Sequence, residues 1–255
     1  MRVTYNNNKV TKVHHYPSSG FENLYFALHE GYPMNSIFAF DYQGIVEKEG
    51  MYYMSWRNKS GEIHTGSVAS GEFQLEDAVY GGTMTPSITG SLSPEITWNG
   101  FTLSALFTFY AGHYMQTNAE FWRQSGSNHG YNAIGGYGGD VYASQLEYWN
   151  GDTSRPANGY RSSLYQNLDY AKYSNSTIEH ADYMKFRNIV LSYSFPQSIC
   201  RKIRINDLRL RLQANNLATW VRNSHGIDPE SAYLSTGEKG YKAPRSYTFS
   251  LSFNL

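Results

Sequence analysis

The side chains that could carry a reaction are few in this sequence, and they are scattered. Only His14 and His15 are adjacent among the eight histidines, and no HExxH-like spacing for a metal occurs. Cys200 is the single cysteine, so it has no partner for an internal disulfide or a redox pair. Glu76 and Asp77 are neighbours in the chain, whereas glycosidases hold two carboxyl groups roughly 5 to 10 Å apart across a cleft. We therefore expect neither an enzyme nor a metal or other cofactor.

The charge and aromatic content point away from nucleic acid. Lys and Arg number 21 and Asp and Glu also number 21, so no net field favours a polyanion. Aromatic residues reach 16%, while charged residues reach only 16%, where about a quarter is usual. This composition is typical of a β-rich protein with large contact surfaces.

Aromatic side chains also gather in the long segment from Gly112 to Asp182, which is rich in Tyr, Asn, Gly and Ser. The candidates for ligand or lid contact are Trp122, Tyr137, Tyr148 and Trp149. They could stack on sugars or contact a lid protein, and they could equally pack the segment on itself. The glycines around Tyr137 are not bracketed by a strand and a helix, which favours loop glycine over a nucleotide site.

The elements that must position these residues are strands with two different faces. In the last segment, apolar residues alternate with Ser, Thr and Asn at period two; the apolar ones are Tyr247, Phe249, Leu251, Phe253 and Leu255. The stretch from Leu208 to Ala214 has the same period, and its polar face carries Arg209, Arg211 and Gln213. Such alternation predicts a strand with a different solvent on each side.

Three further patterns extend the predicted sheet. Residues 183–195 alternate but slip by one position near Asn188, which predicts a β-bulge. Asn99-Gly100 joins strands at 88–98 and 101–111, because both positions of a type I′ turn need positive φ. Pro94 should leave a bulge or a frayed edge there. Weaker strands are expected at 36–44 and within 3–13.

The connections between these strands alternate between short and long. Two residues join them at 99–100 and about ten at 196–207, whereas about 40 residues follow Gly44 and about 70 follow Ala111, against a usual median of about 4 to 6. Short turns at one rim and long loops at the other are the anatomy of an outer-membrane barrel. No apolar run reaches the roughly 18 residues of a membrane-spanning helix, and the mean hydropathy is −0.54. The first twenty residues lack a secretory signal, so we expect a protein that stays inside the cell or a chain that lacks its natural beginning.

The run from Tyr183 to Pro196, YMKFRNIVLSYSFP, resembles a signature of SusC/RagA-type TonB-linked outer-membrane receptors. Further similar segments follow in the order of the family. They are GYPMNSIF from Gly31, WNGFTLS from Trp98, WNGD from Trp149, NNLATW from Asn215, GIDPE from Gly226 and PRSYTF from Pro244. The WNGD segment keeps little of the family's external loop motif, and Leu255 stands where a terminal aromatic residue is common.

The resemblance implies an all-β fold, with residues 1–255 forming the C-terminal fragment of a transmembrane antiparallel β-barrel. Six or seven strands and long external loops would be present out of about 22, and the plug domain and signal peptide would be absent. The implied function is TonB-dependent import of a glycan or peptide in the cell outer membrane. The implied partners are a SusD-like surface lipoprotein, the TonB complex acting through an absent N-terminal part, the barrel-assembly machinery and outer-membrane lipid.

Within that barrel, the apolar row from Tyr247 to Leu255 would face lipid and serve as the assembly signal, and Arg209, Arg211 and Gln213 would face the lumen. An arginine at the membrane midplane on the lipid side would cost roughly 2 to 4 kcal/mol. The arginines would either hold the plug or stay solvated. The alternative is a soluble or surface-attached β-sandwich that binds carbohydrate, in which the apolar rows of two sheets would face each other. A small self-contained barrel would need at least eight strands and its own signal.

Overall fold

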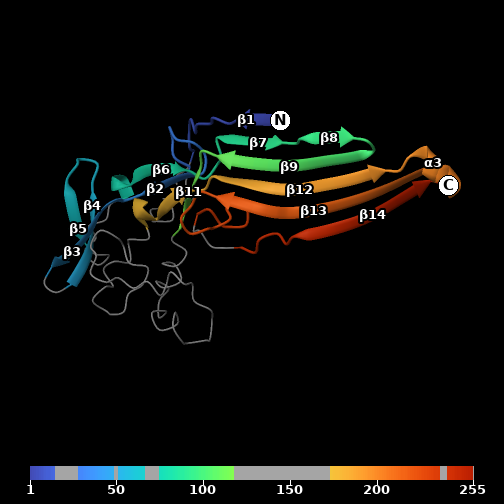
Figure 1. Cartoon of the computed structure of the whole chain (residues 1–255). Coiled ribbons are helices and arrows are strands. Elements are labelled where there is room, and N and C mark those ends of the chain that lie inside the picture. Colours follow the sequence, from blue (N-terminus) through green and yellow to red (C-terminus); the bar gives the residue numbers. More distant parts are fainter. Residues whose placement is uncertain (15–27, 49–50, 67–74, 118–172, 236–239, 255) are drawn as a thin grey trace.

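The computed structural model describes residues 1–14, 28–48, 51–66, 75–117, 173–235 and 240–254. It contains one long antiparallel sheet of seven strands and three small sheets gathered at one end of it (Figure 1). The order in the long sheet is β1-β7-β9-β12-β13-β14, and β8 pairs with β9 beyond β7. The strands are β1 Arg2–Tyr5, β7 Ile88–Leu92, β8 Glu95–Trp98, β9 Phe101–Ala111, β12 Tyr183–Ser194, β13 Asp207–Val221 and β14 Ser246–Asn254. The described part of the chain holds no helix that is both long and apolar enough to cross a membrane.

The tight turn between β8 and β9 forms where the sequence predicts it. Asn99 has φ 47° and Gly100 has φ 85°, the positive values that a type I′ turn requires. Gly100 also lies close to β12, since a Cβ there would approach the carbonyl oxygen of Ser194 to 2.9 Å. Pro94 divides the preceding strand into β7 and β8, and the register on β9 is the same on both sides of the break. The proline therefore leaves a gap in the pairing and no bulge.

The predicted β-bulge of β12 is confirmed. The pairing of β12 with both neighbours shifts between Phe186 and Asn188. Because of this shift, Phe186 faces Phe107 above the bulge while Leu191 faces Leu103 below it. The extra residue thus keeps the apolar rows of adjacent strands in phase along the whole sheet.

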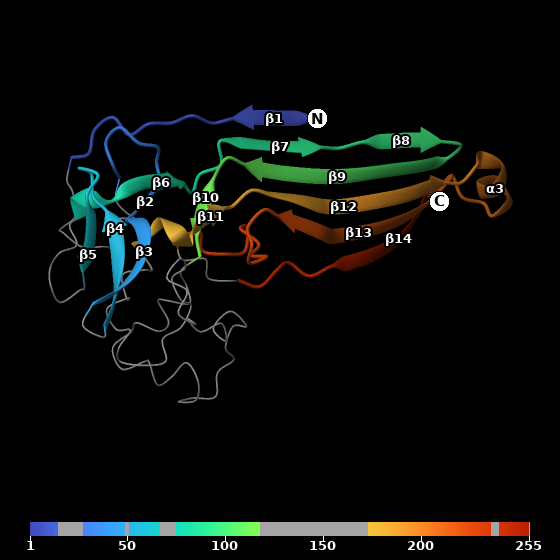
Figure 2. The ribbon, with the colours of Figure 1, turned by 60° about the vertical axis from the view of Figure 1, so that its left-hand side comes forward.

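The short connections lie at the end of the long sheet away from the small sheets. The turn of the β8–β9 hairpin lies at this end. So does α3, Gln197–Lys202, which links β12 to β13 (Figure 2). Cys200 of α3 is buried, with its side chain 1% exposed, and its thiol contacts the carbonyl oxygen of Phe195. This end of the molecule therefore consists of two short connections, the Asn99-Gly100 turn and the segment that contains α3.

The opposite end is built from short strands, most of which were not predicted from the sequence. The predicted strand at 36–44 divides into β2, Ser36–Ala39, and β3, Asp41–Lys48, which belong to different sheets. The small sheets consist of β2 with β6 (Val79–Thr83), β3 with β4 (Met51–Arg57) and β5 (Ile63–Gly66), and β10 (Tyr114–Gln116) with β11 (Ile178–His180). Two short 3-10 turns, Leu75–Asp77 and Asn175–Thr177, complete this end. Within 3–13, the only strand residues are those at the end of β1.

Side-chain burial separates the long sheet from this end. None of the buried apolar residues in the described part of the chain lies in a strand of the seven-stranded sheet. Ile37, Phe40 and Trp56 are 0% exposed at the end with the small sheets, whereas Phe249 is 66% exposed in β14. A β-sandwich would bury its apolar rows against a second sheet about 10 Å away. The exposed rows of a single-layered sheet therefore disagree with the sandwich alternative.

Candidate functional site

The long sheet has two chemically different faces. One cross-strand row consists of Leu103, Leu191, Leu212 and Phe249. The adjacent row, whose side chains point to the opposite face, consists of Thr102, Ser192, Arg211 and Ser250. Because successive residues of a strand point to opposite faces, the sequence alternation becomes an apolar surface on one side and a polar surface on the other.

The predicted lipid-facing residues of β14 share the apolar face. Tyr247, Phe249, Leu251 and Phe253 are 74, 66, 55 and 57% exposed. Their partners on β13 are apolar, since Phe249 lies opposite Leu212 and Leu251 opposite Leu210. Leu255 lies outside the described residues.

The predicted lumen-facing residues lie together on the polar face of β13. Arg209 donates from Nε to Ser194 Oγ at 3.3 Å, and Arg211 donates to Gln213 Oε1 at 2.9 Å. Gln213 in turn donates to Asn215 Oδ1 at 2.7 Å. Within the described ranges neither arginine pairs with a carboxylate, so this ladder presents uncompensated positive charge. Trp122, Tyr137, Tyr148 and Trp149 lie outside the described residues.

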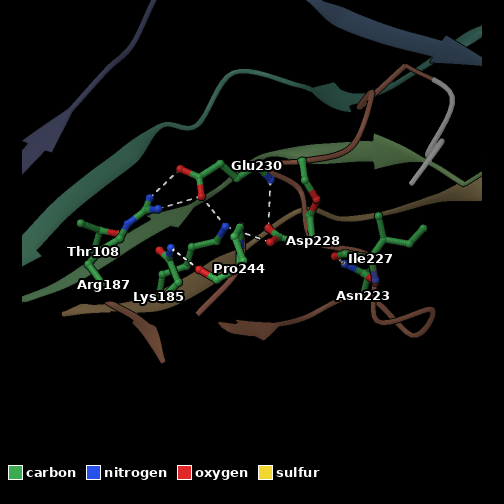
Figure 3. Close-up of polar contacts among 10 residues, drawn as sticks. Thr108, Lys185, Arg187, Asn223, Ile227, Asp228, Glu230 and Pro244 are labelled. Carbon is green, nitrogen blue, oxygen red and sulfur yellow. Dashed lines mark hydrogen bonds and ion pairs between the residues drawn. The ribbon is translucent and has the colours of Figure 1, made fainter. Parts of the chain in front are cut away.

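A charge cluster occupies the same polar face nearer the small sheets. It joins Lys185 and Arg187 of β12 to Asp228 and Glu230, which follow β13 in the chain (Figure 3). The Lys185 ammonium bonds Asp228 Oδ2 at 2.8 Å and also contacts Glu230. The Arg187 guanidinium holds both oxygens of Glu230, at 2.6 and 2.8 Å. Two cations and two carboxylates thus form a neutral, bidentate network.

Local structure explains how these four side chains meet. The alternation of β12 and its bulge point Lys185 and Arg187 to the face of Thr108, whose hydroxyl accepts from Arg187 Nε at 2.8 Å. The carboxylates are placed by a closed turn, in which Asn223 and Ile227 exchange two hydrogen bonds of 2.7 Å (Figure 3). Ile227 then packs with the buried Met115 and Ala181. The cluster therefore fastens the segment after β13 across the polar face.

The electrostatics of the cluster favour its charged form. Hydrogen bonds from Arg187 lower the pKa of Glu230 to about 2, against the opposing effect of partial burial and with support from Lys185. Lys185 and Asp228 are 7 and 3% exposed. Removing one partner of such a pair leaves a buried charge without compensation. The sequence places Lys185 and Arg187 on the polar side and contains the GIDPE segment, but no short-range signal joins residues 43 positions apart.

A second polar group lies at the small sheets. Asp182 accepts the backbone N–H of Gly112 at 2.8 Å and Arg222 at 3.0 Å, and the His113 ring lies 3.6 Å away. Burial lowers the pKa of His113 even though Asp182 acts in the opposite direction.

Glu179 of β11 binds the segment after β13, two to three residues beyond Arg222. It accepts from the backbone N–H and the hydroxyl of Ser224, at 2.6 and 2.8 Å, and pairs with His225 at 2.7 Å. Burial would raise the pKa of Glu179, but the bonds from His225 and Ser224 outweigh it and bring the pKa to about 2. Together with the charge cluster, these contacts fix residues 222–230 at both ends.

The cluster borders a pocket of ≈ 300 Å³, whose wall includes Lys185, Asp228, Lys242 and Arg245. Among the described residues, no group of three or more His, Cys, Asp and Glu is placed to hold a metal ion. The four side chains of the charge cluster form ion pairs only with one another in the described part of the chain. The chemistry of the cluster is that of a charged, hydrogen-bonding surface beside an opening.

These features define the class of fold as all-β and antiparallel, consistent with a segment of β-barrel wall, with one apolar face and one polar face. Solved structures share it. A chain of the RagAB peptide importer in an open-open state matches with TM-score 0.67 and 22% identity, over 99% of this chain and 26% of that one. Chains of the RagAB peptide transporter (TM-score 0.62, 22% identity, 89% and 23% covered) and of the closed-closed importer (0.61, 23%, 89% and 24%) also match.

The protein thus spans about a quarter of the length of the solved chains that it matches. No protein-family model matches the sequence, and no curated protein matches it. At 22 to 23% identity the likeness shows the fold.

Proposed function

We propose that this chain is part of an outer-membrane importer of the SusC/RagA type, and that residues 1–255 supply the C-terminal portion of its barrel. The observation that carries the proposal is the single-layered sheet with its apolar rows exposed. A backbone ladder satisfies every interior N–H and C=O, while an uncovered apolar face suits hydrocarbon. The sequence resemblance to SusC/RagA receptors and the structural likeness to RagAB chains support it.

We infer the direction of the sheet in the membrane from the difference between its two ends. Outer-membrane barrels have short periplasmic turns and long external loops. The Asn99-Gly100 turn and α3 then face the periplasm, and the three small sheets lie outside the cell. The charge cluster lies on the polar face below those sheets, where it holds residues 222–230 beside the mouth of the pore.

The complete importer would need parts outside this chain. The seven-stranded sheet has open edges at β14 on one side and at β1 and β8 on the other, and these must pair with further barrel strands in lipid. We propose that it takes up a peptide or glycan too large for passive diffusion, through a plug moved by the TonB complex. A SusD-like surface lipoprotein would cover the external end, and the barrel-assembly machinery would read β14. None of this calls for an enzymatic step.

Paired cysteine variants in β14 test the proposal. Cys200 is buried and is first replaced, as Cys200→Ser, to give a silent background. In outer membranes, Leu251→Cys should react with a lipid-soluble maleimide and not with a charged one, whereas Ser250→Cys, on the polar face, should react with the charged reagent as well. Equal labelling of both positions by the charged reagent would contradict the proposed membrane face.

A further inference from the structure

A pocket opens in the small sheets, apart from the charge cluster. Its volume is ≈ 420 Å³, and its wall includes His29, Tyr32, Phe38 and Tyr80 together with the charged Glu30 and Lys59. Under the proposed function this aromatic pocket lies on the external end of the receptor. Ligand sites in proteins usually have about this size and combine aromatic walls with a few polar groups.

The aromatic wall is preformed by backbone pairing. Phe38 of β2 and Tyr80 of β6 are directly opposite each other, with their ring centroids 5.9 Å apart. The Tyr32 ring lies 4.9 Å from Phe38 in an edge-on arrangement and 5.2 Å from Tyr80. Two hydrogen bonds of 2.8 Å, from Gly31 to Val10 and from Val10 to Tyr32, pin the backbone that carries Tyr32. The rings are therefore fixed before any ligand arrives.

The outer part of this wall stays open. Phe38 is 8% exposed and forms the floor, but Tyr32 and Tyr80 are 39 and 40% exposed. Partly exposed aromatic rings around a pocket can stack on a flat or apolar group of a ligand. Each aromatic pair formed in this way contributes about 1 kcal/mol beyond the burial of apolar area.

The charged side chains of the wall narrow the class of ligand. Glu30 already accepts the Val13 N–H at 2.8 Å, which fixes its carboxylate, and Lys59 makes no ion pair within the described ranges. A neutral sugar could hydrogen-bond both groups through its hydroxyls, but it would bring no opposite charge to either of them. A peptide carries an ammonium or amide N–H groups for the carboxylate, and carboxylate or carbonyl groups for the lysine.

We infer that the aromatic pocket is a contact site for imported peptides, in which Tyr32, Phe38 and Tyr80 receive an aromatic or large apolar side chain while Glu30 and Lys59 bind the polar groups that flank it. This inference rests on the proposed function and deepens it, since it names a peptide as the substrate class.

Titration of the assembled receptor, extracted from outer membranes in mild detergent, tests the inference. The probes are the tripeptide Gly-Phe-Gly, the matched Gly-Gly-Gly and the neutral sugar maltotriose. Gly-Phe-Gly should bind at least about fivefold more tightly than Gly-Gly-Gly, since one ring contact is worth about 1 kcal/mol. Tighter binding of maltotriose than of Gly-Phe-Gly would overturn the peptide assignment.

Variants locate the binding. Tyr80→Ala should weaken Gly-Phe-Gly about fivefold through the loss of one aromatic contact, while Tyr80→Phe, which keeps the ring, should leave it unchanged. Tyr233→Ala removes a 69% exposed tyrosine outside the pocket and should have no effect. An equal loss in Tyr80→Ala and Tyr233→Ala would place the ligand elsewhere.

Glu30→Gln and Lys59→Gln should each reduce the salt dependence of peptide binding, and unaltered salt dependence in both would contradict the part given to the charges. Absence of all binding in a receptor whose β14 labelling shows the lipid face would overturn this inference and leave the importer standing. Failure of that labelling would overturn the proposed function itself.

Discussion

Trp98 and Trp56 show how differently the two regions of this chain use a large aromatic side chain. Trp98 of β8 is 73% exposed on the apolar face of the long sheet. Trp56 of β4 is 0% exposed, with its ring 6.2 Å from Phe40 and stacked at 5.8 Å on His64. The small sheets are held by the burial of side chains against one another. The long sheet is held by the backbone hydrogen bonds between its strands, and the apolar side chains on one of its faces stay exposed.

Replacing these two tryptophans tests the comparison most strongly. Trp56→Ala should destabilise the end with the small sheets by about 3 to 5 kcal/mol, because it empties a fully enclosed site. Trp98→Ala should change stability by less than about 1 kcal/mol, since the residue is 73% exposed. Urea titration of the receptor in lipid vesicles, followed by limited proteolysis of the external end, measures both. Similar losses in the two variants would mean that the long sheet has a protein core.

Lys185→Ala should break the junction between the two regions. The substitution leaves Asp228 buried without its cation and should cost about 3 to 5 kcal/mol. The expected result is faster proteolysis of residues 222–235, with β12 and β13 still assembled. Lys202→Ala, at an exposed lysine of α3, is the matched control and should behave as wild type. Unchanged protection in Lys185→Ala would show that the cluster does not hold this segment.

Arginine substitutions in β14 distinguish its two faces. Leu251→Arg places a charge on the apolar face and should cost roughly 2 to 4 kcal/mol near the membrane midplane. Ser250→Arg adds the same side chain to the polar face, opposite Arg211, where water is available, and should be tolerated better. The fraction of receptor that migrates as a folded barrel in unheated gels measures the effect. Equal loss of folded barrel would argue against the assigned faces.

Acidification should act on the end with the small sheets before it acts on the rest. Glu230 and Glu179 have pKa values of about 2, below the ordinary 4.5, so their stabilising contacts are complete above 4.5 and are lost as the pH falls toward 2. The pKa of His113 is also lowered, by burial, so protonation below its ordinary 6.5 works in the same direction.

Proteolysis of residues 222–235 should therefore accelerate between pH 6.5 and 2, while the β13–β14 ladder stays protected. Glu230→Gln should remove about half of the acid-dependent step below pH 4.5, because Glu179, whose pKa is lowered equally, keeps its own contribution. If that variant showed the wild-type acid profile, the Arg187 and Glu230 contact would not be the source of the step.

Much of the long sheet follows from local chemistry. Alternation at period two is itself the geometry of a strand, so the faces of Tyr247 and Arg211 could be assigned by counting. The pair Asn99-Gly100 predicted the turn, because few residue pairs accept a positive φ at both central positions of a type I′ turn. The slip near Asn188 marked the bulge because a change of phase would otherwise turn every following side chain to the wrong face.

The end with the small sheets could not be found in this way. The alternation of aromatic residues predicted one strand at 36–44, but all four residues of β2 are buried, and no alternation showed that β2 and β3 belong to different sheets. The partner of β2, β6, begins 40 residues later, and no local signal states that pairing. The same holds for Lys185 with Asp228 and for Tyr32 with Tyr80, whose contacts depend on how separate segments meet.

By itself, the sequence determined an antiparallel sheet with one greasy and one polar side, because strand geometry turns a repeat of two residues into two surfaces. Only the tertiary structure decided that, among the described residues, no second layer covers the apolar side. It also decided that a compact end with its own core forms within the long connections, and that four distant charges meet beside the bulge. These outcomes depend on contacts between residues far apart in the chain, whose free energy no short stretch of sequence contains.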